Sequence, residues 1–273
     1  MCKKINLKKI PHIQIQERDT TEYVRSLYEN QSKNNLSYWY DKINTIFNTP
    51  DTIIIPLSFE RFYWLGNDRY EQDDIAAFSH ELIEYMHQHN FNTDRELFVK
   101  TGTFSNKFRF NHGPHVTDIN NIGTHALQCA YGGLCVGCEF SREIVVREFI
   151  HTDYVRPSIY DGMKLNTEMR VFYDFDNNVV LGIFNYWDKE TMIQHLHNDE
   201  LSIFTSCIDD IERDVQRLTP ILLQECEKLE SVDLQHQWSI DFLWDGHQFY
   251  LIDMALAQNS YFFDKVLKSE TIC

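Results

Sequence analysis

The stretch ELFVKTGTFSNKF, residues 96–108, decides the fold. Its apolar start predicts a β-strand over Leu97–Lys100, and the small and polar residues that follow predict a turn leading to Lys107. Small residues such as Gly102 and Ser105 let backbone N–H groups approach an anion, and the two ammonium groups supply compensating charge. The stretch therefore predicts a triphosphate cradle, although it lacks the GxxxxGK[ST] pattern of a P-loop. The competing interpretation is a surface hairpin with two solvated lysines.

Upstream of this stretch, the pattern indicates strand, helix and strand. Thr52–Leu57 (TIIIPL) is a β-branched apolar run typical of a buried parallel strand. Asp73–His89 places apolar residues on one helical face and predicts an amphipathic helix. Residues 1–50 are polar and predict short helices and loops. This order favours a βαβ-like, α/β start to the fold.

Downstream, the elements indicate an α+β half. Thr117–Tyr131 predicts a helix that ends at the following glycine pair, and Glu143–Ile150 predicts a strand. Residues 168–175 and 179–186 flank an Asp-Asn-Asn turn, and residues 238–243 and 249–253 flank an Asp-Gly turn, so two hairpins are expected. Leu201–Leu229 predicts a long helix kinked or split at Pro220.

The segment EIVVREFI, residues 143–150, is the candidate adenine site. Arg147, Glu148, Phe149 and Ile150 end the predicted strand. Their backbone edges would face the ring, with the side chains of Phe149 and Ile150 near its faces. The alternative is an edge strand whose Arg147 and Glu148 face solvent.

Strand alternation places Glu168 and Arg170 on one face of the first predicted hairpin. The default interpretation is that these two side chains form a salt bridge with each other. If that face borders a cleft, Arg170 would instead contact a phosphate or a substrate carboxylate.

The second predicted hairpin carries the candidate metal ligands. Asp241 and Asp253 lie inside apolar strands, where an ionised carboxylate needs a partner such as a hard cation. Asn259 on the following loop would add a neutral oxygen. Magnesium commonly takes one or two carboxylates together with substrate phosphates. The alternative is that Asp253 caps the helix that follows.

Three cysteines allow a different site. Cys129, Cys135 and Cys138, with upstream histidines at His112, His115 and His125, contain enough ligands for zinc. A single CxxC lacks the second pair of an ordinary zinc module, so buried structural cysteines are favoured.

The overall composition limits the classes of partner. The formal net charge is -16, with 25 Lys and Arg against 41 Asp and Glu, which argues against binding a nucleic-acid backbone. The basic start MCKKINLKKI lacks the apolar stretch of a secretory signal, and no segment reaches the length of a membrane span. Seven scattered cysteines do not indicate a disulfide framework, so a reducing cytoplasm is expected.

Taken in order, these segments resemble the ATP-grasp superfamily, most closely its small divergent members in phages and bacteria. They also resemble an ATP-grasp assembly factor of a eukaryotic translation-initiation complex. The match covers roughly residues 96–262.

The resemblance implies an α+β fold with two lobes that clasp ATP. The expected divisions are a smaller α/β N-terminal lobe over 1–95, a central lobe over 96–148 and a C-terminal lobe over 149–273.

The same resemblance implies ATP and Mg²⁺ as cofactors and assigns the site residues. Nucleotide contacts fall to Lys100, Ser105, Lys107, Arg147, Glu148, Phe149, Ile150 and Glu168, catalysis to Lys107 and Arg170, and metal binding to Asp241, Asp253 and Asn259.

The implied activity is ligation of a carboxylate acceptor to an amine through an acylphosphate, with a peptide or a protein among the candidate substrates. The alternative is a nucleotide-dependent assembly factor with little turnover. One departure from the family pattern bears on this choice. Ala255 stands where many members carry an amide ligand to the metal.

Overall fold

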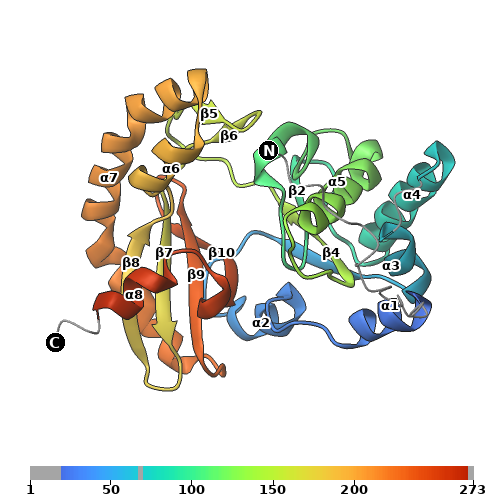
Figure 1. Ribbon diagram of the computed structural model, residues 1–273, viewed down its shortest axis with the longest axis horizontal. Helices are drawn as coiled ribbons and strands as arrows, with labels where there is room; N and C mark the ends of the chain where they lie inside the picture. The colour runs from blue at the N-terminus through green and yellow to red at the C-terminus, as the bar shows by residue number, and fades with distance from the viewer. Residues whose placement is uncertain (1–19, 67–69, 270–273) are drawn as a thin grey trace, which may run out of the picture.

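A computed structural model describes residues 20–66 and 70–269. The basic segment discussed above, with Cys2, lies outside the described residues, as does Cys273. Two lobes, each built on a four-stranded antiparallel sheet, stand side by side (Figure 1). The predicted α+β class is confirmed.

The first sheet has the strand order β1-β4-β2-β3, from β1 (Thr52–Pro56), β4 (Glu143–Glu148), β2 (Leu97–Thr101) and β3 (His115–Val116). The prediction that Thr52–Leu57 is a parallel strand is wrong, because β1 pairs antiparallel with β4. Strand β2 also pairs antiparallel with β4, so β4 separates β1 from β2. Only Ile53, Ile55 and Leu57 of this run are buried, because β1 stands at the end of the strand order, and the β-branched pattern carried no information on strand direction.

Three helices pack on this sheet: α3 (Phe59–Leu65), α4 (Gln72–Gln88) and α5 (Ile122–Cys135). Helix α4 confirms the predicted amphipathic helix. Helix α5 starts later than predicted and continues through Gly132 and Gly133, so the predicted stop is wrong. A Cβ at Gly132 would lie 2.8 Å from the Asn106 side chain, so this glycine permits close packing. The helix ends instead near Gly137, whose φ of +76° suits a C-terminal cap.

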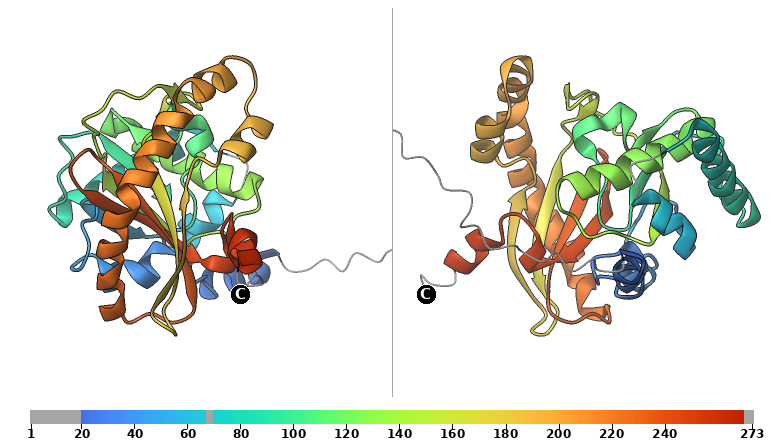
Figure 2. Two further views of the ribbon diagram at one scale, coloured as in Figure 1. Left: turned by 90° about the vertical axis from the view of Figure 1, so that its left-hand side faces the viewer. Right: turned by 45° about the vertical axis from the view of Figure 1, so that its right-hand side comes forward.

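The second sheet has the order β10-β9-β7-β8 and contains both predicted hairpins. Its strands are β7 (Glu168–Asp174), β8 (Val179–Asn185), β9 (Gln237–Trp244) and β10 (Phe249–Leu256). The long helix α7 (Asn198–Cys226) lies along the sheet (Figure 2). It is one helix through Pro220 rather than two. The shorter helices α6 (Lys189–His195) and α8 (Phe263–Ser269) flank the same lobe.

The described part of segment 1–95 contributes to both lobes. Helix α1 (Thr20–Glu29) packs near α3, whereas α2 (Leu36–Ile43) buries Leu36, Trp39 and Ile43 in the core beneath the second sheet. Strand β1 belongs to the first sheet. The boundary predicted at residue 95 therefore falls inside the first lobe.

Short elements join the two lobes. The pair β5 (Ser158–Ile159) and β6 (Met163–Lys164) and the 3-10 turn η2 (Lys107–His112) share a core with α6 and α7. Among the described residues, no helix combines the length and apolar character needed to cross a bilayer.

Candidate functional site

A cavity with about 690 Å³ of empty space lies between the lobes, and every residue predicted to contact a nucleotide lines it. Strand β2 and the following loop form one wall, the end of β4 forms the back, and β7 and β10 form the opposite wall. The predicted residues on its surface are Lys100, Ser105, Lys107, Arg147, Glu148, Phe149, Ile150 and Glu168.

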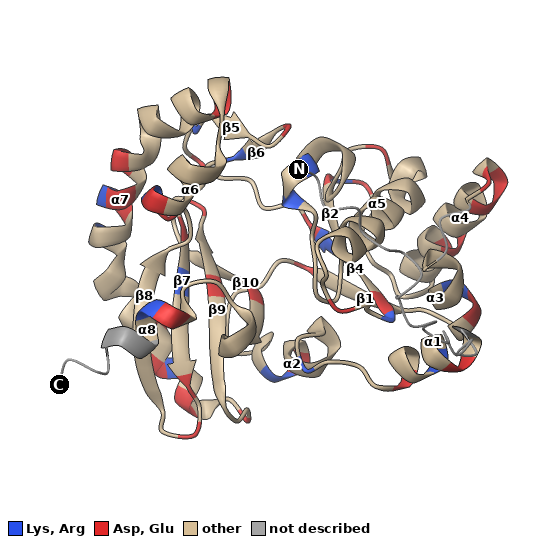
Figure 3. Ribbon diagram, in the orientation of Figure 1, with Lys and Arg blue, Asp and Glu red and all other residues tan. Residues whose placement is uncertain are grey.

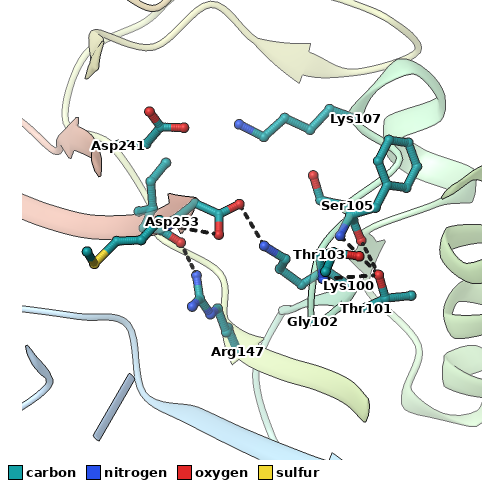
Figure 4. Close-up of polar contacts among 12 residues, drawn as sticks. Lys100, Thr101, Gly102, Thr103, Ser105, Lys107, Arg147, Asp241 and Asp253 are labelled. Carbon is teal, nitrogen blue, oxygen red and sulfur yellow. Dashed lines mark hydrogen bonds and ion pairs between the residues drawn. The ribbon is translucent and has the colours of Figure 1, made fainter. Parts of the chain in front are cut away.

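Lys100 is the deepest cation of the site. Its side chain on β2 is 2% exposed, and its Nζ donates to Asp253 Oδ2 at 2.7 Å across the two lobes (Figure 4). Burial lowers the pKa of Lys100, and attraction to Asp253 opposes this only in part. Burial alone would raise the pKa of Asp253, but Lys100 and Arg147 outweigh it, so that pKa is lowered.

Lys107 is the first residue of η2 and also pairs with a carboxylate of the second lobe, but in this pair the carboxylate is more buried than the lysine. Its Nζ donates to Glu168 Oε2 at 3.1 Å, and it lies 4.6 Å from the centre of the Tyr186 ring. Here the carboxylate is the buried member, with a side chain 1% exposed against 21% for the lysine. Burial would lower the pKa of Lys107, but the charges of Glu168, Tyr186 and Asp241 outweigh it and raise that pKa.

The loop between the lysines is held by hydrogen bonds within the loop and to Ser141. The N–H groups of Gly102 and Phe104 donate to Ser141 Oγ at 3.1 Å and Thr101 Oγ1 at 3.0 Å. Because these two N–H groups already have acceptors, fewer backbone donors remain for the predicted triphosphate cradle. Within the described part of the chain, no hydrogen bond uses the N–H or the hydroxyl of Ser105. Ser105 extends from the same lobe as Lys100 and Lys107, opposite Asp253 and Asp241 (Figure 4).

Arg147 closes the back of the cavity. It is 4% exposed, and its Nη1 donates to the carbonyl of Ile252 on β10. Its Nε is buried without a hydrogen-bond partner. A buried donor of this kind costs free energy unless an acceptor reaches it.

The end of β4 provides one free backbone donor. The N–H groups of Glu148 and Phe149 donate to the carbonyls of Asp51 and Glu96, whereas the N–H of Ile150 has no partner among the described residues. The Glu148 carboxylate is 3.0 Å from Arg95. Apolar side chains surround this end of the cavity: Phe98, Phe110, Phe149, Ile150, Met163 and Leu243. Their sequence positions are scattered, and no local pattern marked Phe98, Phe110, Met163 or Leu243.

Arg170 and Asp241 form a two-pronged ion pair between β7 and β9. Arg170 Nε and Nη2 each donate to one oxygen of Asp241 at 2.8 Å, and the guanidinium lies 5.0 Å from the Tyr186 ring centre. Burial would lower the pKa of Arg170, but Asp241 outweighs it and raises that pKa. The expected salt bridge between Glu168 and Arg170 is wrong, because Arg170 pairs with Asp241 and Glu168 pairs with Lys107.

The predicted metal ligands separate into two groups. Asp241 and Asp253 are cross-strand partners beside an irregularity in the β9-β10 ladder. Asn259 lies in the turn η5 (Ala257–Asn259), is exposed, and accepts a hydrogen bond from Asn34 at 3.3 Å. Asn259 is on the surface of neither interlobe cavity, whereas both aspartates line the second. Asp253 lies within β10, not at the start of the following helix, so it does not cap one.

A second cavity, with about 1360 Å³ of empty space, adjoins the first. The two cavities share Ser105, Lys107 and Asp253 and therefore meet at these three residues. Both proposed catalytic residues, Lys107 and Arg170, line it. Strand β2 in one lobe carries a basic position, and strands β9 and β10 in the other lobe carry acidic positions (Figure 3). Sequence patterns did not identify the aromatic walls of this cavity, because they come from widely separated segments.

The zinc alternative lacks a ligand cluster in residues 20–66 and 70–269, where no three His, Cys, Asp or Glu side chains lie together as metal ligands. Cys129 is buried and its thiol contacts the carbonyl of Val99. Burial also raises the pKa of the Cys129 thiol well above its usual range.

No protein-family model and no curated protein matches the sequence. Among solved structures, C-terminally truncated Cdc123 from Schizosaccharomyces pombe matches with a TM-score of 0.50 and 15% identity, over 86% of this chain and 89% of that one. The D-alanine–D-alanine ligase of Helicobacter pylori matches with a TM-score of 0.42 and 11% identity, over 86% and 56%. A RimK-domain ATP-grasp protein from Sphaerobacter thermophilus matches at 0.37 and 10%, over 91% and 64%.

This chain thus spans less than two thirds of each of these two longer proteins. At these identities the likeness concerns the fold alone. The fold is similar to that of Cdc123 over most of both chains, and its mixed helix and sheet architecture is the one that the sequence resemblance predicted.

Proposed function

We propose, from the ATP-grasp fold and the cations in its cleft, that this chain binds ATP in the first cavity and uses it to ligate a carboxylate to an amine. The observation that carries the proposal is the set of four cationic side chains that reach one cleft from both lobes: Lys100, Lys107, Arg147 and Arg170. The lining also includes Lys164 and five carboxylates: Glu148, Glu168, Asp188, Asp241 and Asp253. Because Arg95 and Lys265, outside the cavities, pair with Glu148 and Asp188, the cations of the lining outnumber the three remaining carboxylates, which suits a polyanion.

The proposed orientation follows from the contrast between the two ends of the first cavity. The free N–H of Ile150 and the apolar side chains around it suit an adenine ring. Lys100, Ser105 and Lys107 suit the phosphates at the other end, where the second cavity begins. The γ-phosphate would then lie at the join of the two cavities.

Magnesium would be held first by Asp253. This carboxylate is 38% exposed, lies at the join of the cavities, and bears a negative charge because its pKa is lowered. Asp241 is a second oxygen donor, but Arg170 already holds both of its oxygens. Bound magnesium supplies neutralisation of phosphate charge in such sites.

The proposed reaction needs no side-chain nucleophile. An acceptor carboxylate oxygen attacks the γ-phosphorus and the bond to ADP breaks, giving an acylphosphate. The amine nitrogen then attacks the acyl carbon, phosphate leaves with the bonding electron pair, and the amine proton passes to solvent. Lys107 and Arg170 stabilise the negative charge that develops between the cavities, which is the main contribution a protein makes to phosphoryl transfer.

The test is product analysis with a panel of carboxylates and amines. The proposal predicts that ATP yields ADP and phosphate only when an acceptor is present, and that Arg170→Leu lowers turnover more than ATP affinity. AMP as product, or no turnover across a broad panel, would contradict ligation.

A specific observation favours the alternative of a nucleotide-dependent protein-binding or assembly factor. Ala255 has no donor for a metal, Asn259 is engaged elsewhere, and both aspartates are already paired with cations. If these pairs persist with ATP bound, nucleotide binding would occur with little turnover. Tight ATP binding that remains unhydrolysed over the whole panel would identify this case.

A further inference from the structure

We infer that the second cavity selects the acceptor, and that the acceptor is a carboxylic acid with an aromatic or large apolar body. This inference rests on the proposed ATP-dependent ligation. It adds the chemical class of the substrate, which the fold does not specify.

The position of the cavity suits an acceptor. Ser105, Lys107 and Asp253 belong to both cavities, so a molecule in the second one reaches the proposed γ-phosphate end of the first. Lys107 and Arg170 flank the Tyr186 ring, at 4.6 and 5.0 Å from its centre. The ring thereby holds both cations at the inner end of the cavity.

These cations retain donors for a carboxylate. Lysine has three N–H donors and arginine five. Lys107 uses one on Glu168, and Arg170 uses two on Asp241 with a longer contact of 3.4 Å to the Tyr261 carbonyl. An acceptor carboxylate would therefore find free donors without breaking either ion pair.

Seven of the 17 residues that line the cavity are aromatic. Besides Tyr186, they include Phe104, Phe108, Tyr160, Trp187, Tyr261 and Phe262. Phe108 comes from the first lobe and Tyr261 from the second, and they are 58% and 56% exposed. Large exposed aromatic side chains on both sides of a cavity gain most when an apolar ligand covers them.

The other charged groups of the cavity disfavour a charged body. Asp188 accepts from Lys265 at 2.9 Å and from Thr191, and His195 is bonded through Nδ1 to the Thr191 carbonyl at 2.8 Å. A second charged group on the acceptor would find no unpaired partner in Asp188 or His195. It would also lose its hydration among the aromatic rings. An uncharged apolar body avoids this cost.

The experiment measures binding rather than turnover, so that it does not depend on the identity of the amine. Protein saturated with the nonhydrolysable analogue AMP-PNP and Mg²⁺ is titrated by calorimetry with N-acetyl-L-phenylalanine, N-acetyl-L-alanine and N-acetyl-L-glutamate. Burial of one aromatic side chain predicts that the phenylalanine probe binds at least about tenfold more tightly than the alanine probe. The glutamate probe should bind no better than the alanine probe.

Two variants and a matched control locate the effect. Phe108→Ala and Tyr261→Ala should each remove most of the tenfold preference while AMP-PNP binds as before. Tyr23→Ala should change nothing, because Tyr23 is 52% exposed on α1 and is not on the cavity surface.

Equal binding of the three probes, absence of binding by all of them, or an undiminished preference in both variants would overturn the inference if AMP-PNP still binds. Failure of AMP-PNP itself to bind would instead contradict the proposed function and remove the premise.

Discussion

Lys100 and Lys107 lie at the two ends of one loop, and each pairs with a carboxylate of the opposite lobe, but the buried partner differs between the two pairs. In the first pair the lysine is buried and its partner Asp253 is 38% exposed. In the second the lysine is partly exposed and its partner Glu168 is buried. The side that loses water carries the energetic cost of the pair. Lys100 therefore depends on its carboxylate for stability, whereas Lys107 is better placed to exchange its partner for a ligand.

Removing the carboxylate of each pair should give the largest effect and separate the two. Asp253→Asn leaves the buried ammonium of Lys100 uncompensated and should cost roughly 3 kcal/mol of unfolding free energy. Glu168→Gln should cost less, about 1–2 kcal/mol, because the Lys107 ammonium retains contact with water. Urea unfolding of the two variants measures the difference. As a control, Asp209→Asn removes an exposed partner of Lys189 and should cost under about 1 kcal/mol. A larger loss in Glu168→Gln than in Asp253→Asn would reverse the comparison.

Gly102→Ala should disturb the spacing between the two lysines. A Cβ at Gly102 would lie 2.3, 2.4 and 2.7 Å from oxygens of Glu143, Asn35 and Ser141, all of them buried. The loop must shift, at a cost of about 1–3 kcal/mol typical of overpacking. ATP affinity should fall as well, since the loop carries Lys107. Thermal unfolding and calorimetry check both effects.

Gly66→Ala is the matched control for this change, because its Cβ would meet only the Phe140 ring and a backbone oxygen at 3.3 Å or more. Wild-type ATP affinity in Gly102→Ala would show that the loop does not position Lys107.

The Asp253 pair should also weaken in acid. Its folded pKa lies below the ordinary value of 3.8, so its contribution to stability is complete above pH 3.8 and is lost as the pH falls through the folded pKa. The stability difference between wild type and Asp253→Asn should therefore be constant from neutral pH to about pH 4 and shrink below pH 3.8. Urea titrations at several pH values measure it. A difference that already shrinks between pH 7 and pH 5 would contradict the lowered pKa.

The smallest effect is expected at Asn259, the predicted metal ligand that the structure places on the surface. Asn259→Ala should change stability by less than about 0.5 kcal/mol and leave the magnesium dependence of ATP binding unchanged. A marked rise in the magnesium concentration required would restore Asn259 to the metal site and weaken the separation of ligands described above.

Local sequence patterns predicted much of the fold and part of the site. Turn residues such as Asn177 and Gly246 located both hairpins. The eight residues predicted to contact a nucleotide all line one cavity, and each was identified from the local pattern of one strand or loop. What requires long-range packing was not predictable. The insertion of β4 between β1 and β2, and the close approach of Gly132 to Asn106, depend on contacts between distant segments.

The aromatic cavity shows the same limit. Phe108, Tyr160, Tyr186 and Tyr261 come from four separate segments, and each looks like an ordinary core or surface residue in its own sequence context. They come together only because the two lobes pack side by side.

The most direct measurement for the central claim is calorimetric titration of ATP with Mg²⁺ into wild type, Lys100→Met, Lys107→Met and the control Lys189→Met. Loss of one charge-assisted contact predicts affinities weaker by roughly tenfold or more in each cleft variant, and no change at Lys189, which pairs with Asp209 on the surface. Absence of ATP binding by the wild type, or equal affinity in all four proteins, would contradict a nucleotide site built on Lys100 and Lys107.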